Sequence, residues 1–422
     1  MNIAAPKGTV DILPAESWKW QAIEAIARQV AELYHFSEIR TPIFEHSELF
    51  HRGVGETSDI VHKETYTFDD RGGRSITLRP EQTAGVVRAM IESNLLADAG
   101  ARAKVFYIGP NFRYENVQKG RLRQHHQFGV EAFGVAVPEQ DVECILLQMD
   151  FYRRCGIKDL ALRLNSLGDG ESKYQYGQSL KNHLQPKLAQ LSNDSQRRWA
   201  TNPLRILDSK DPRDIEACHG APSALDYLSE RSRKHFDRVL GFLAGLGMAN
   251  YLKIDPTLVR GFDYYTDTLW EVTTSGLGSQ NALGGGGRYD NLIETLGGKP
   301  TPGVGFGSGI ERLLIALEAQ GAAIPNSQKP LIWLVSQNDA ARDYNFILIA
   351  ELRAAGIACD MDLTGRKQDK QMKLANREHA TWCIIVGETE LTSNSVMLKN
   401  LSTGEQLPVG RSEIVQRLKD AK

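Results

Sequence analysis

Apolar residues recur at helical spacing near the start of the chain and predict a long amphipathic helix. They are Trp20, Ile23, Ile26, Val30 and Leu33. Pro14 suits the first turn of this helix, which we expect to end near His35. Residues 36–44 then have an extended pattern, because Pro42 keeps the residue before it out of the helical region.

Two later segments alternate in the manner of antiparallel strands. Residues 107–113 are apolar and aromatic, with a Gly-Pro break, and residues 126–133 alternate with a period of two. That alternation places Gln127 and Glu131 on one face and apolar side chains on the other. We expect the pair to direct Arg113, Gln127 and Glu131 toward one ligand, while the basic segment between the strands covers another part of it.

Other patterns complete the first three quarters of the chain. Residues 66–78 predict a hairpin around an Asp-Asp-Arg-Gly-Gly turn, and a helix begins near Ala84. From residue 170 to about 248 the composition is rich in Lys, Gln, Ser and Leu and the pattern is helical. Strand character returns over residues 254–272.

Residues 321–330 form a short stretch with two prolines, which is typical of a linker. Beyond it, strands and helices alternate. The expected strands are 331–335, 357–361 and 382–386, and the expected helices are 340–355 and 366–379. This alternation predicts a mainly parallel sheet with right-handed crossovers.

Bulk properties change this picture only a little. The chain has 422 residues, enough for more than one domain, and a formal net charge of −2. An RNA-binding surface would therefore have to be local.

Cysteine usage and the chain's start bear on the compartment. The five cysteines are scattered without a C-x-x-C pair, Lys7 and Asp11 interrupt any leader-like apolar run, and no apolar stretch approaches membrane length. The adjacent His125 and His126 would point to opposite faces of a strand, which argues against a shared metal. We expect a reduced cytoplasmic protein without disulfides, structural zinc or a membrane span.

Four segments carry the candidate chemistry. They are Gly109-Pro-Asn-Phe-Arg-Tyr-Glu115 with its continuation to Glu131, Leu258-Val-Arg-Gly-Phe-Asp-Tyr-Tyr265, Gly285-Gly-Gly-Arg-Tyr-Asp290, and Gly303-Val-Gly-Phe-Gly-Ser-Gly-Ile-Glu-Arg-Leu313. In this order and spacing they resemble signatures of the class II aminoacyl-tRNA synthetases, in the form carried by histidyl-tRNA synthetases. The first resembles motif 2, the last resembles motif 3, and the two between them resemble histidine-specific signatures.

The resemblance runs nearly end to end and implies an α+β fold. A catalytic domain built on an antiparallel sheet would span residues 1–325, with a helical insertion at about 170–250. An α/β anticodon-binding domain would span residues 326–422. The helix and strand over residues 14–44 would correspond to motif 1 and form a homodimer interface, although periodicity alone allows an ordinary helix packed on a sheet.

The resemblance also implies the reaction. ATP and L-histidine would give histidyl-adenylate and pyrophosphate, and the acyl group would pass to the 3′ end of tRNA(His), with Mg²⁺ accompanying ATP. Because both first-step reactants are anionic, the enzyme would contribute positioning and positive charge.

On this resemblance, Arg113 and Arg260 would be catalytic and grip the α-phosphate from two sides. Arg312 would stack on adenine and reach the terminal phosphate. Arg121 would contact the γ-phosphate, and Glu115 would lie near adenine. An isolated arginine is more often a solvated surface residue, so only the motif context favours these roles.

The implied histidine-binding residues are Glu81, Thr83, Arg113, Gln127, Glu131, Arg260, Tyr264 and Tyr265. Glu81, Thr83 and Gln127 would serve the ammonium group, and Glu131 and Tyr264 would hydrogen-bond the imidazole. The alternative to a binding role is that Tyr264 and Tyr265 pack in the core with their hydroxyl groups hydrogen-bonded.

A basic series falls at helical spacing in the last segment: Arg366, Lys370, Lys373 and Arg377. It is a candidate tRNA-binding strip, since neutralised phosphates supply affinity for nucleic acid. A solvated helix face explains it equally well.

The sequence departs from the family pattern at two places. Gln82 stands where glycine is usual, beside the expected ammonium contacts, and its side chain must point away or add a contact. Asn116-Val117 replaces an arginine-proline pair in the segment that would face the tRNA acceptor end.

Two other interpretations remain. A paralogue of this fold serves as a regulatory subunit of ATP phosphoribosyltransferase, but such chains typically lack the last domain and have lost ATP-site arginines. A class II synthetase for another amino acid, such as threonine or proline, would lack the signature from Arg260 to Tyr265.

Overall fold

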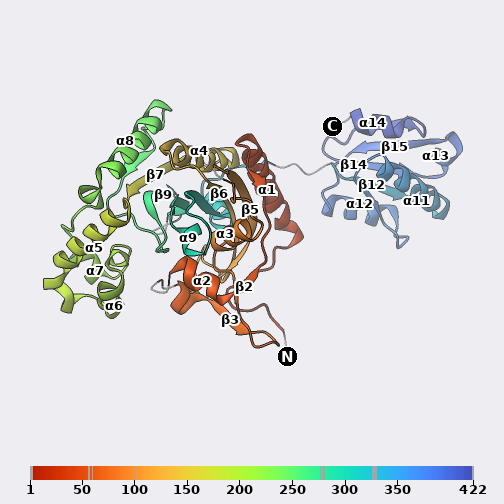
Figure 1. The fold of residues 1–422 in the computed structure, drawn as a ribbon. Helices are drawn as coiled ribbons and strands as arrows, with labels where there is room; N and C mark the ends of the chain where they lie inside the picture. Colours follow the sequence, from red (N-terminus) through yellow and green to blue (C-terminus); the bar gives the residue numbers. More distant parts are fainter. Residues whose placement is uncertain are drawn as a thin grey trace. The chain divides into compact units, whose positions relative to one another are not determined.

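The computed structural model describes residues 3–55, 58, 60–98, 100–275, 277, 281–325 and 330–420. The chain divides into two units, Met1–Asn326 and Ser327–Lys422, which are described separately below (Figure 1). The linker expected at residues 321–330 falls partly outside the described residues, since 326–329 are not among them. In the described part of the chain, every helix is too short or too polar to span a lipid bilayer.

The first unit is built on a large sheet with the strand order β1-β5-β6-β11-β10-β9-β7-β8. From β5 to β7 all neighbours are antiparallel, whereas the edge strands β1 and β8 pair in parallel. The bounds are β1 Ser37–Glu38, β5 Ala103–Phe112, β6 Gln124–Phe133, β7 Leu160–Ser166, β8 Leu252–Ile254, β9 Thr266–Thr274, β10 Ala282–Arg288 and β11 Gly303–Gly309.

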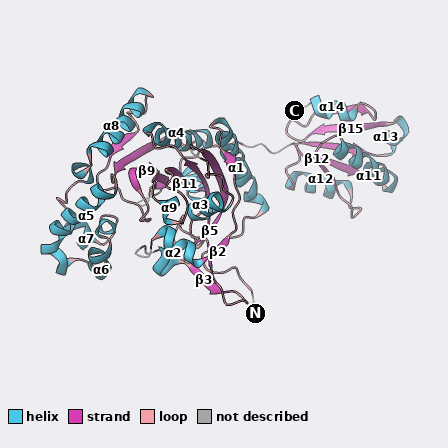
Figure 2. Ribbon diagram, viewed as in Figure 1, coloured by secondary structure: helices cyan, strands magenta, loops and turns pink. Residues whose placement is uncertain are grey.

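Helices cover one face of this sheet (Figure 2). They are α1 Pro14–Leu33, α4 Pro138–Cys155, α8 Glu230–Gly245 and α10 Ile310–Ala319. Their apolar faces share one core with the sheet, in which Phe128 and Val130 of β6 are fully buried. The alternation predicted for β6 is therefore confirmed, because Gln127 and Glu131 face away from that core and line a cavity.

Smaller elements surround the opposite face. The expected hairpin is present as β3 and β4, which form a sheet of order β2-β4-β3. These elements are β2 Phe44–His46, α2 Ser47–Val54, the π-helical turn η1 Ile60–Glu64, β3 Tyr66–Asp69, β4 Ser75–Leu78, α3 Thr83–Glu92 and α9 Leu292–Thr295.

The segment from residue 170 to 245 is helical, as its composition predicted, and its helices gather on one side of the first unit (Figure 1). Leu180, Leu184, Leu191 and Ile206 form a small core of its own. Before α8, its elements are α5 Gly170–Leu184, η2 Gln185–Gln190, α6 Asn193–Thr201, η3 Pro203–Ile206, α7 Pro212–Ala217 and η4 Ala224–Tyr227.

The second unit is a three-layer domain with the strand order β13-β12-β14-β15-β16. Successive residues of β12 enter cores on opposite faces, Leu334 with α11 and Val335 with α12. The elements are β12 Ile332–Ser336, α11 Asp339–Ala354, β13 Cys359–Met361, α12 Gln368–Arg377, β14 Trp382–Val386, α13 Glu388–Ser393, β15 Ser395–Asn400, β16 Gln406–Gly410 and α14 Ile414–Asp420.

Two predictions for this unit need correction. The sheet is mixed, because β15 and β16 form an antiparallel hairpin beyond the parallel β13-β12-β14 group. The short connection between β15 and β16 allows only antiparallel pairing. Helix α12 begins at Gln368, so Arg366 lies before it rather than on its face; the Asp362 carboxylate holds the Arg366 backbone N–H at 2.9 Å in the preceding turn.

A buried ion pair ties the glycine-rich strand β10 to the helical layer. The Arg288 guanidinium and the Asp141 carboxylate are both fully buried and hydrogen-bonded to each other. Asp141 also accepts from Thr268 at 2.5 Å and lies 2.7 Å from the His235 ring. Burial raises the pKa of Asp141, but the Arg288 charge and these hydrogen bonds outweigh it, and the pKa lies below its ordinary value.

We expect Arg288→Met to lower the free energy of unfolding by about 3–5 kcal/mol, because it leaves Asp141 buried without its main counter-charge. Denaturant unfolding measures the loss. Arg238→Met is the matched control, since Arg238 of α8 also pairs with an acid of α4, Glu139, but is 59% exposed. The control should change stability by no more than about 1 kcal/mol. Equal, small losses in both variants would contradict a structural role for the buried pair.

Candidate active site

A cavity of about 530 Å³ opens on the sheet face that α1, α4 and α10 leave uncovered. Its walls come from β5, β6, β9, β10 and β11, from the segment that follows β8, and from the helical region after α5. Strand ends and loops thus supply most of the polar groups, while the sheet forms the floor.

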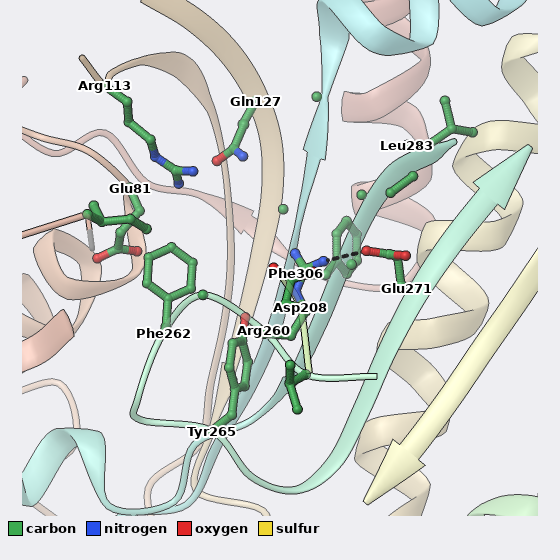
Figure 3. Close-up of a pocket in the computed structure, with 18 of the residues that line it drawn as sticks. Glu81, Arg113, Gln127, Asp208, Arg260, Phe262, Tyr265, Glu271, Leu283 and Phe306 are labelled. Carbon is green, nitrogen blue, oxygen red and sulfur yellow. Dashed lines mark hydrogen bonds and ion pairs between the residues drawn. The ribbon is translucent and has the colours of Figure 1, made fainter. Parts of the chain in front are cut away.

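The structure brings the site residues predicted for the first unit into this one cavity. The lining includes Glu81, Thr83, Arg113, Glu115, Arg121, Gln127, Glu131, Arg260, Tyr264, Tyr265 and Arg312. Several are visible in Figure 3, where Arg113 and Gln127 lie across from Arg260. The basic series from Arg366 to Arg377 belongs to the second unit.

Glu131 forms the polar centre of the cavity's deepest part. One carboxylate oxygen accepts hydrogen bonds from Thr83 at 2.7 Å and from Tyr107 at 3.1 Å, and the other accepts from Tyr289. Burial raises the pKa of Glu131 to about 8, although these hydroxyl groups oppose the rise. Burial likewise raises the pKa of Tyr264 and Tyr265, so both remain neutral phenols.

Glu81 lies beside this cluster at the start of α3. Its carboxylate accepts from the backbone N–H groups of Thr83 at 2.6 Å and Ala84 at 2.9 Å. These are first-turn donors that the helix itself cannot satisfy. Burial raises the pKa of Glu81, and these hydrogen bonds lower it only in part.

Arg113 follows β5 and is held in place by several contacts. Its Nε donates to the Pro80 carbonyl at 2.7 Å, and its guanidinium lies 5.6 Å from the centre of the Phe262 ring. Glu115 bridges two arginines, with one oxygen 3.7 Å from Arg113 and the other 3.4 Å from Arg121. This end of the cavity is therefore positively charged and pre-arranged for an anion.

Arg260 is oriented by a chain of alternating charges, which Figure 3 shows in part. Its guanidinium pairs with Glu271 at 3.0 Å, and the other Glu271 oxygen pairs with Arg163 at 2.7 Å. Arg163 in turn pairs with Asp255 at 2.6 Å. Arg163 and Glu271 lie opposite each other on neighbouring strands, so this series of ion pairs fixes Arg260 against the sheet.

Glycines keep the cavity floor clear of side chains. A Cβ atom at Gly305 would collide with the Glu131 carboxylate, and one at Gly285 would come within 2.5 Å of the Trp270 carbonyl oxygen and 3.1 Å of the Arg260 guanidinium. Gly129 has the same effect, because the Tyr107 ring lies across it. Only a residue without a side chain fits at these positions.

The departures noted in the sequence have a structural outcome at Gln82. Its side chain is buried and donates to the Gly109 carbonyl at 3.3 Å, so it adds a contact to β5.

The two adjacent histidines separate as expected. His126 bonds Glu311 at 2.9 Å, whereas His125 lines the cavity, where burial and the Arg113 charge lower its pKa to about 3.

Comparison with known proteins agrees with this geometry. A family model described as histidyl-tRNA synthetase matches residues 8–313, and one described as anticodon binding domain matches residues 324–421. The chain belongs to the histidyl-tRNA synthetase family.

Relatives resemble the chain over its whole length. Proteins named histidine–tRNA ligase are 48% identical in Anoxybacillus flavithermus and 46% identical in Bacillus subtilis, each over 99% of both chains. The crystal structure of apo S. aureus histidyl-tRNA synthetase superposes with a TM-score of 0.84 at 38% identity, covering 99% of this chain and 100% of that one.

Family membership settles several expectations. Full-length relatives support an enzyme that charges tRNA with histidine, and the regulatory-subunit interpretation is not favoured. Synthetases of this kind use ATP as a substrate, generally with Mg²⁺. The α+β fold with an antiparallel sheet and a C-terminal anticodon-binding domain is confirmed.

Several residues that hold the predicted site residues in this cavity were not predicted from the sequence. Tyr107, Tyr289, Glu271 and Arg163 contact Glu131 or lead to Arg260, and none was assigned a role. Tyr289 lies inside a recognised signature, so its position was a usable signal. The helical region also contributes to the lining, through Arg198, Arg205, Leu207, Asp208 and Lys210.

We expect Glu131→Gln to change how stability depends on pH. Because burial raises the pKa of Glu131 to about 8, the folded protein keeps a proton that the unfolded chain releases above its ordinary pKa of 4.5. Raising the pH from 5 to 8 should therefore destabilise the unliganded wild type relative to the variant, by up to about 1.4 kcal/mol per pH unit. Denaturant unfolding at pH 5, 6.5 and 8 measures the difference. A constant difference would contradict a raised pKa.

Proposed function

We propose that the cavity catalyses both steps of histidine charging, with the residues that line it in the following roles. A carboxylate oxygen of L-histidine attacks the α-phosphorus of ATP, the bond to pyrophosphate breaks, and histidyl-adenylate forms. A hydroxyl at the 3′ end of tRNA(His) then attacks the carbonyl carbon and releases AMP. The observation that carries this proposal is the convergence of residues from separate signatures on one cavity.

The positive residues form the phosphate half. Arg113 and Arg260 approach the α-phosphate from two sides and act as the catalytic residues, because charge gathers there in the transition state. Arg312 stacks on adenine and reaches the terminal phosphate, and Arg121 contacts the γ-phosphate. Glu115 lies near adenine and keeps Arg113 and Arg121 oriented. Pre-arranged arginine forks suit phosphate oxygens because they donate paired hydrogen bonds.

The buried acids and phenols form the histidine half. Glu131 and Tyr264 hydrogen-bond the imidazole, while Glu81, Thr83 and Gln127 receive the ammonium group. Tyr265, Arg113 and Arg260 complete the contacts to the substrate. A histidine ring brings an additional N–H donor to the buried Glu131 side chain, which an apolar side chain of similar size lacks.

Mg²⁺ enters with ATP in this proposal. Among the described residues, His, Cys, Asp and Glu side chains form no group of three or more that could hold a metal ion. Two acids beside the proposed phosphate arginines, Glu115 and Glu271, are already paired with arginines. The ATP phosphates themselves therefore supply ligands for the ion.

The second unit would serve tRNA binding. Lys370 and Lys373 are exposed on α12, whereas Arg377 is paired with Glu378 at 2.9 Å and Arg366 precedes the helix. We propose that this basic surface contributes to the contact with tRNA.

Two further expectations concern assembly and compartment. We propose a homodimer formed through α1 and the strands after it, where Leu33, Ile43, Phe44 and Phe68 are exposed apolar side chains. We also expect a cytoplasmic location, since all five cysteines are free thiols.

Pyrophosphate exchange with each amino acid in turn tests the function. We expect ATP–pyrophosphate exchange with histidine alone, and a loss on the order of 10²–10³-fold in Arg260→Ala, because one pre-organised charge at the α-phosphate is removed. Arg238→Ala, at an exposed arginine that is not part of the cavity lining, is the control. Exchange with another amino acid would overturn the substrate, and full activity in a folded Arg260→Ala would overturn the role of Arg260.

Removing the second unit should separate the two steps. A chain ending at residue 326 keeps every cavity residue, so we expect histidine-dependent exchange to persist while tRNA charging falls severely. Circular dichroism must first show that the truncated chain is folded, and its number of subunits must match that of the intact protein. The full chain with Lys370→Ala and Lys373→Ala tests the basic surface without a truncation. Charging by the truncated chain at the intact rate would contradict a tRNA-binding role for this unit.

A further inference from the structure

The segment over residues 258–265 carries three of the proposed site residues but has no helix or strand of its own. It joins β8 to β9 as turns and irregular chain, and it supplies Arg260, Tyr264 and Tyr265 to the cavity. A site requires its polar groups to be held within fractions of an ångström. The conformation of this segment must therefore be fixed by contacts from outside it.

The helical region supplies such contacts. Lys173 of α5 donates to the backbone carbonyls of Asp263 at 2.6 Å and Tyr265 at 3.2 Å. Asn202, just before η3, donates to the Asp263 carboxylate at 2.7 Å. Arg205 of η3 donates to the Arg260 carbonyl at 3.1 Å.

The targets of these bonds decide what they do. Lys173 hydrogen-bonds the carbonyls of the residues before and after Tyr264, so it fixes the backbone from which the Tyr264 side chain extends. Arg205 hydrogen-bonds the carbonyl of Arg260 near the other end of the segment. Hydrogen bonds from a charged donor in a half-buried place are stronger than bonds between neutral groups. Burial lowers the pKa of Lys173 and the nearby Asp263 charge raises it, as for an ammonium group enclosed by acceptors.

We propose that Lys173, Asn202 and Arg205 are positioning residues, through which the helical region holds the 258–265 segment in the geometry that histidine activation needs. The inference rests on the proposed function of the cavity. Because Lys173 acts next to Tyr264, its loss affects the histidine half of the cavity, whereas Arg205 acts on the side of Arg260 and the phosphates. The helical region is then part of the first chemical step and not only an appendage to the catalytic sheet.

Lys173→Met tests this assignment by removing the charge and keeping most of the length. In pyrophosphate exchange we expect the KM for histidine to rise about ten-fold or more, the size expected for a lost charge-assisted hydrogen bond, with the KM for ATP nearly unchanged. Lys173→Arg should restore much of the loss. Lys181→Met is the matched control, because Lys181 lies on the same helix and bonds the Ala200 carbonyl at 3.2 Å within the helical region.

Amide hydrogen exchange on the unliganded protein gives a second readout that needs no activity. In the wild type the backbone N–H groups of Leu258 and Asp263 are hydrogen-bonded, to Asp255 at 3.0 Å and Val54 at 3.4 Å. Lys173→Met should speed exchange in peptides covering residues 258–265 about ten-fold and leave the strands of the sheet unchanged. Lys181→Met should not.

The outcomes separate this inference from the proposed function. Faster exchange in 258–265 and a selective rise in the KM for histidine support it. Unchanged exchange and unchanged KM in a folded Lys173→Met overturn it, as do equal losses for histidine and ATP with faster exchange throughout the unit. If that variant does not fold, Asn202→Ala provides the same two readouts. A wild type without histidine-dependent activity would refute the proposed function, while hydrogen exchange would still report on the segment.

Discussion

Strands β10 and β11 carry glycines where a sheet ordinarily carries side chains, and the cavity exists because of this. A Cβ atom at Gly305 would occupy the space of the Glu131 carboxylate, and one at Gly285 would press on the Trp270 carbonyl and the Arg260 guanidinium. A bare sheet surface is costly, since glycine loses more conformational freedom on folding than any other residue. The buried pair of Arg288 and Asp141 joins the end of β10 to α4.

The polar groups around this bare floor are arranged in two electrostatic halves. One half contains buried acceptors and phenols around Glu131, whose pKa burial raises to about 8. The other contains arginines held by the acids Glu115 and Glu271. An amino acid with a polar ring and a triphosphate differ in the same way, so the two halves suit the two substrates of the proposed reaction. The acids beside the arginines orient them and leave donors for an anion.

Parts of the chain distant from the sheet also reach the site. The helical region after α5 lines the cavity and bonds the segment that presents Arg260 and Tyr264. Glu311, beside Arg312, accepts from the backbone N–H of His126 at 2.8 Å and ties α10 to β6. Side chains from neighbouring elements thus contact segments that have no regular structure, and these contacts restrict where such a segment can place its polar groups.

From the sequence alone, local periodicity predicted individual helices and strands, including the helical region, because it reflects short-range constraints. The resemblance to known signatures implied the family, the antiparallel sheet and the main cavity residues. Only the tertiary structure decided which partners hold these residues. Tyr107 and Glu271 come from strands whose patterns carry no chemical cue, and they meet Glu131 and Arg260 through sheet pairing and packing. The turn that Asp362 holds before α12 and the short connection between β15 and β16 were likewise visible only in the structure. Contacts between residues far apart in sequence leave no periodic trace, so the fold alone reveals them.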